Sequence, residues 1–194
     1  MTLREELEAH LRGRVLIVGV GNVLRGDDGA GPAVVASLAG RVDEEVALLD
    51  ASEVPENYLG TMTAAQPDSI LVVDAVDLGA EPGRAGLLRE DQLTTQGGST
   101  HHFPLRLLLQ FLREETSAEV RLLGLQPARI GLAEEWLGRQ AAATWRLSDP
   151  VRAAVPALAE LLVSCLAARP RRPSVVGPGP CHHALSRGEV CRTS

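Results

Sequence analysis

The chain has 194 residues, 45% of them hydrophobic, which is enough for one domain with a full core. Its net charge of −6 argues against a nucleic-acid partner, and its 19 basic residues include no lysine, which excludes lysine nucleophiles and Schiff-base chemistry. The three cysteines all come late, which is not typical of a disulfide framework. Neither a signal peptide nor an apolar run of membrane-spanning length is evident, so we expect a cytoplasmic protein without a membrane partner.

The hydrophobic pattern predicts alternating helices and strands. The first helix is expected at the surface over residues 3–12, with His10 facing solvent. Strands are predicted at about 14–20, 46–50, 69–75 and 118–125, with an edge strand at 84–89. Further helices are predicted at about 28–40, 55–65, 104–115 and 144–168, the last bent or restarted at Pro150 and Pro156.

Continuous apolar strands such as 69–75 are typical of parallel sheets that are buried on both faces. The predicted fold is therefore α/β, a three-layer αβα sandwich around a mostly parallel, twisted sheet of about five strands. We assign residues 1–168 to this domain. The Arg- and Pro-rich composition of residues 169–194 indicates a disordered tail.

A glycine-rich stretch, Gly19–Gly31, lies between the first strand and the following helix. It departs from the Gly-x-Gly-x-x-Gly dinucleotide fingerprint, and a phosphate-binding P-loop would need a lysine, so we expect no nucleotide. Asp27 and Asp28 lie where the helix should begin. One reading is that an aspartate only caps the helix; the other is that it serves a functional site.

Further candidate groups lie at strand ends and in one loop. Asp74 ends a buried strand, and a buried charge needs a partner. If strands one and three are neighbours, Asp28 and Asp74 face each other, and the loop with His101 and His102 would close over them. Such a set would suit a divalent metal, or the two carboxylates would share a proton and act as acid and base. The residues alone do not choose between these alternatives, or between the two histidines.

Other polar candidates have weaker cases. Asp50 and Asp77 are strand-end and loop carboxylates, and Cys165 is expected in the core. Cys181, His182, His183 and Cys191 match no structural zinc pattern.

Several segments, in order, resemble the hydrogenase maturation proteases, the endopeptidases that trim the large subunit of nickel-iron hydrogenases. The resemblance covers about residues 14–168 and is greatest to the subgroup that serves formate-hydrogenlyase-type hydrogenases. The matching segments are Val18–Asn22, Gly26–Pro32, Asp50–Asn57, Val72–Ala75, Ser99–Leu105 and Gly124–Pro127.

The resemblance implies an activity and a site. The chain is expected to remove a C-terminal extension from a hydrogenase large-subunit precursor, with nickel already in the substrate as the recognition signal. It implies Asp28 and Asp74 as catalytic residues, and Asp28, Asp74 and His101 as contacts to that transient metal. It also suggests a monomer. A non-catalytic nickel-checking or chaperone module, and a different α/β hydrolase with a carboxylate pair, are the alternatives.

Overall fold

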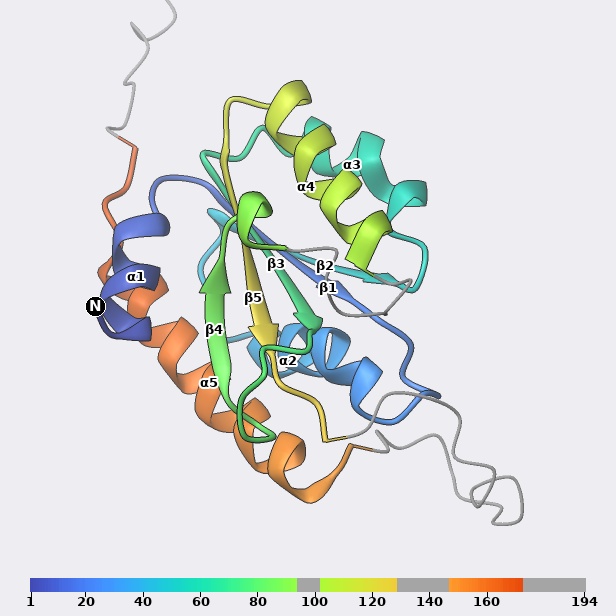
Figure 1. The fold of residues 1–194 in the computed structure, drawn as a ribbon. Coiled ribbons are helices and arrows are strands. Elements are labelled where there is room, and N and C mark those ends of the chain that lie inside the picture. Colours follow the sequence, from blue (N-terminus) through green and yellow to red (C-terminus); the bar gives the residue numbers. More distant parts are fainter. Residues whose placement is uncertain (94–101, 129–146, 173–194) are drawn as a thin grey trace, which may run out of the picture.

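The computed structural model describes residues 1–93, 102–128 and 147–172 (Figure 1). Its centre is a five-stranded sheet in the order β2-β1-β3-β5-β4. The strands in chain order are β1 Val15–Val20, β2 Val46–Ser52, β3 Ser69–Ala75, β4 Ala85–Leu88 and β5 Glu119–Leu125. Only β4 runs antiparallel, at the edge beside β5. The predicted α/β class and the predicted adjacency of the first and third strands are therefore confirmed.

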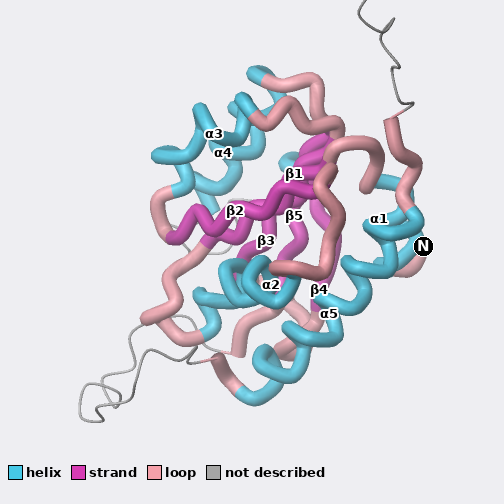
Figure 2. Tube along the Cα trace, turned by 180° about the vertical axis from the view of Figure 1, so that it is seen from behind, coloured by secondary structure: helices cyan, strands magenta, loops and turns pink. Residues whose placement is uncertain are grey.

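Helices cover both faces of the sheet (Figures 1 and 2). α1 Leu3–His10, α2 Ala30–Leu38 and α5 Asp149–Ala168 pack on one face, and α3 Leu59–Ala64 and α4 His102–Glu115 on the other. Within the described residues, three short 3₁₀ turns join these elements: η1 Asp27–Gly29, η2 Pro55–Tyr58 and η3 Glu90–Gln92. Each face has its own apolar core, because the side chains of a strand alternate between the two faces.

The expectation that His10 faces solvent is wrong. Its exposed fraction is only 2%, and its Nε2 lies 3.1 Å from the carbonyl oxygen of Ile70 in β3. The last turn of α1 packs over the sheet, so a histidine in a short, charged helix becomes part of the core. Cys165 is 1% exposed, which confirms its expected place in the core.

The chain leaves the domain later than the composition predicts. Arg169 is 5% exposed, and its guanidinium donates to both carboxylate oxygens of Asp43, at 2.7 and 3.0 Å. It also donates to the carbonyl oxygen of Gly13 at 2.9 Å. Arg169 thus ties the end of α5 to the loops before β1 and β2. The rest of the predicted tail, with Cys181, His182, His183 and Cys191, lies outside the described residues from 173 onward.

The long helix α5 differs from two expectations: that the chain has no apolar segment of membrane-spanning length, and that the helix restarts at a proline. By length and composition alone it would suffice to cross a membrane. It belongs to the core instead, since a stripe of its side chains is buried against the sheet and α2: Val151, Val155, Leu158, Ala159, Leu162, Cys165 and Leu166. Pro150 occupies the first turn, where its missing N–H costs nothing, and one helix continues through Pro156 without the expected restart.

Candidate active site

Glycines shape the turn that follows β1. Gly21 has φ +128°, and a Cβ on it would lie 1.8 Å from the carbonyl oxygen of Asp28. At Gly31, a Cβ would lie 2.3 Å from the carbonyl oxygens of both Val20 and Val73, so the start of α2 can rest directly on β1 and β3. Only glycine allows these approaches, and they bring η1 to the carboxyl edge of the sheet.

Asp27 is a structural anchor. Its side chain is nearly inaccessible, with the residue 1% exposed. Its carboxylate accepts hydrogen bonds from the backbone N–H of Ala128 at 2.8 Å and of Ser148 at 2.6 Å, and from the Ser148 hydroxyl at 2.8 Å. Ser148 is the N-cap residue of α5. The N-cap of α2 is Gly29, without a side-chain cap hydrogen bond, so the capping reading is not confirmed for that helix. Asp27 instead holds the N-cap residue of a helix that begins more than 120 residues later in the chain.

Asp28, by contrast, lies beside Asp74. Its Oδ2 accepts from the N–H of Asn22 at 2.9 Å, and Asp74 Oδ1 accepts from the N–H of Ala75 at 2.7 Å. Burial raises the pKa of Asp74 well above its usual value, and the negative charge of Asp28 raises it further; the Ala75 hydrogen bond acts in the opposite direction. The structure thus brings together the two carboxylates that the sequence singled out, at the carboxyl edge of neighbouring strands.

A pair of this kind can act in two ways. It can hold one proton between two carboxylates and serve as acid and base, or it can bind a cation whose charge offsets the repulsion. Among residues 1–93, 102–128 and 147–172, no group of three His, Cys, Asp or Glu side chains is placed to hold a metal ion. The expected third contact, His101, lies outside the described residues. Its role stays a prediction.

The other strand-end acids have local partners. Asp50 Oδ1 accepts from the N–H of Ser52, and Asp77 Oδ1 accepts from the N–H of Gly79 and from the Gln126 side chain. Gln126 also accepts, through its Oε1, from two N–H groups of the loop after β3, at Leu78 and Ala80. Gln126 was not among the predicted site residues; its place directly after a predicted strand is the signal that could have found it.

Asn22 links the turn to the neighbouring strand. Its side-chain amide donates to Glu53 Oε2 at 2.7 Å, while its backbone N–H bonds Asp28. Glu53 follows the carboxyl end of β2, so the site is joined to the segment that enters η2. Both residues lie in segments that resemble the family, Val18–Asn22 and Asp50–Asn57, but the sequence alone did not predict their contact.

Comparison with known proteins agrees with this architecture. Residues 32–165 match the family model described as hydrogenase maturation protease. The Hydrogenase 3 maturation protease of Escherichia coli is 33% identical over 117 residues, which cover 60% of this chain and 74% of the relative. The hydrogenase expression/formation protein HupD of Bradyrhizobium diazoefficiens is 30% identical over 165 residues, 79% of this chain and 78% of the relative.

A solved structure extends the likeness to the fold. The crystal structure of a [NiFe] hydrogenase maturation protease HycI from Thermococcus kodakarensis superimposes with a TM-score of 0.69 and 34% identity, over 84% of this chain and 99% of that one. Since the family model alone spans more than half of the sequence, the chain belongs to the hydrogenase maturation protease family and is a peptidase.

Proposed function

We propose that the protein is the endopeptidase that removes the C-terminal extension of a nickel-iron hydrogenase large-subunit precursor after nickel insertion. Family membership supports the peptidase activity and the hydrogenase precursor as substrate. The paired carboxylates Asp28 and Asp74 carry the proposal, because they lie at the carboxyl edge of the sheet, where α/β folds of this class hold their reactive groups.

Nickel enters this proposal as part of the substrate. Asp28, Asp74 and His101 would contact it, and none of the three is a thiolate that would compete with cysteine ligands of the precursor. A cation beside Asp74 would offset the repulsion from Asp28 and lower the pKa that burial has raised. The carboxylates would then accept a proton from the attacking water, while the metal polarises the scissile carbonyl.

The experiment is cleavage of purified precursor, followed by gel mobility, with and without nickel. The nickel-loaded form should be shortened and the metal-free form left intact. Asp28→Asn and Asp74→Asn should each abolish processing while the domain stays folded. Equal cleavage of both precursor forms, or full activity in both variants, would refute the mechanism.

The remaining expectations belong to the same proposal. We infer a cytoplasmic monomer that acts without a nucleotide, a nucleic acid or a membrane. A protein that binds the nickel-loaded precursor without ever cleaving it would instead be the nickel-checking module. Hydrolysis of small esters or amides without metal would indicate the different carboxylate hydrolase.

A further inference from the structure

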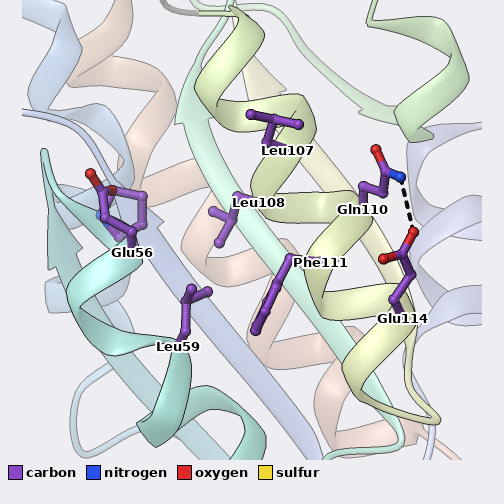
Figure 3. Close-up of a pocket in the computed structure, with 8 residues that line it drawn as sticks. Glu56, Leu59, Leu107, Leu108, Gln110, Phe111 and Glu114 are labelled. Atoms are coloured by element: carbon purple, nitrogen blue, oxygen red, sulfur yellow. Dashed lines mark hydrogen bonds between the residues drawn. The ribbon is translucent and has the colours of Figure 1, made fainter.

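An apolar groove lies between the segment that starts at η2 and the helix α4 (Figure 3). Its volume is about 510 Å³, within the range of cavities that bind ligands. Figure 3 shows Leu59, Leu108 and Phe111 pointing into the space between the two helices. Leu107 stands at the rim and is 49% exposed. A surface of this composition is typical of a site that another polypeptide covers.

Hydrogen bonds connect the segment that lines the groove to the candidate active site. Asp28 accepts a hydrogen bond from the backbone N–H of Asn22, and the Asn22 side chain donates to Glu53, two residues before Pro55, which lines the groove. The groove therefore begins only a few residues along the chain from a side chain that contacts the turn of Asp28.

Exposed apolar side chains belong both to the turn of Asp28 and to the surroundings of the groove. Among the described residues, the large hydrophobic side chains that are exposed, apart from Met1, are Val23, Leu24, Val54 and Leu107. Val23 and Leu24 belong to the glycine turn beside Asp28, and Val54 lies between Glu53 and Pro55. Two of the four therefore belong to the turn that carries Asp28, and the other two adjoin or line the groove.

The charge of the groove restricts its occupant. Among the residues that the structure describes, Glu56 and Glu114 line it and no arginine does. Glu114, at the α4 edge of the groove, accepts a hydrogen bond from Gln110 at 2.9 Å (Figure 3). An acidic, apolar groove is complementary to a segment that combines large apolar side chains with Lys or Arg.

We propose that this groove docks a segment of the precursor polypeptide that carries apolar side chains and at least one basic residue. The proposal rests on the proposed function for the identity of the partner. It adds a binding surface that is separate from the metal contacts, so the groove should bind the precursor whether or not nickel is present.

The test measures binding of metal-free precursor to the full chain by biolayer interferometry. Leu107→Arg places a cation in the groove and should weaken binding at least about tenfold, and Glu114→Arg should weaken it several-fold, mainly through slower association. Glu115→Arg is the matched control, since it makes the same charge change at the next, exposed residue of α4, which does not line the groove. Thermal melting checks that each variant is folded.

Activity on nickel-loaded precursor gives the second readout. The groove variants should raise KM and leave kcat near that of the unaltered protein. If Leu107→Arg and Glu114→Arg bind like the unaltered chain, or Glu115→Arg weakens binding as much as Glu114→Arg, the docking proposal is overturned. A wild-type dimer that Leu107→Arg dissociates would mean that a second copy covers the groove, and tighter precursor binding after removal of residues 173–194 would mean that this segment does.

The two proposals fail in different ways. Groove-dependent binding without cleavage would refute the peptidase function on this precursor and leave the docking surface standing. Nickel-dependent cleavage with binding that ignores the groove variants would do the reverse.

Discussion

Asp27 and Asp28 are adjacent and chemically identical, yet the same substitution should affect them differently. In Asp27→Asn, one carboxylate oxygen becomes an NH₂ group that cannot accept a hydrogen bond. In the unaltered protein, the Asp27 carboxylate accepts hydrogen bonds from the backbone N–H groups of Ala128 and Ser148 and from the Ser148 hydroxyl, and the residue is 1% exposed. The Ser148 hydroxyl can rotate away from the new NH₂ group, but one of the two backbone N–H groups is left facing that NH₂ group without an acceptor.

The cost follows from these contacts. A hydrogen bond to a buried charged group contributes about 1.5–3 kcal/mol, so the loss of one and the weakening of the others should lower the free energy of unfolding by about 3 kcal/mol. For a domain of this size, that corresponds to a Tm about 6–12 °C lower. Differential scanning calorimetry at neutral pH gives the measurement.

Asp28→Asn is the control. Asp28 accepts one backbone hydrogen bond, from Asn22, and its charge disfavours ionisation of Asp74. Removing that charge relieves repulsion, so the free energy of unfolding should change by less than about 1 kcal/mol while processing is lost. An Asp27→Asn protein as stable as wild type, or equal destabilisation by both variants, would refute the assignment of anchor and site residue.

Three further outcomes are expected. Burial lowers the pKa of His10 from 6.5 to about 4, so between these pH values the unfolded chain binds a proton that the folded chain does not. The free energy of unfolding should therefore fall by up to about 3 kcal/mol as the pH drops from 6.5 to 4. Urea unfolding should show a smaller pH dependence for His10→Gln. A chain ending at Arg172 should melt like the full chain, whereas one ending at Ala168 loses the buried Arg169 contacts and should be about 3 kcal/mol less stable in the same assay, an expectation that equal stability would contradict. Gly21→Ala places a Cβ 1.8 Å from the Asp28 carbonyl oxygen and should abolish precursor processing; unchanged cleavage would show that the turn adapts.

Local pattern was sufficient where a segment's environment follows from its own residues. The strand at 69–75 was predicted with the bounds that the structure has, because a central parallel strand is apolar throughout. The strand-end positions of Asp28 and Asp74 also placed them at one sheet edge before the fold was known. The amphipathic spacing of 104–115 gave α4 its type and, within two residues, its start.

Contacts between distant segments decided the rest. Asp27 became an anchor because Ser148, 121 residues away, donates to it, and nothing in the neighbouring sequence separates it from Asp28. His10 and Arg169 became buried because β3 and the loop at Asp43 lie against them. The groove needs η2 and α4 side by side, so no single segment encodes it. The sequence therefore determined the elements and the reactive edge, while burial, which is a property of the packed whole, assigned each polar side chain its role.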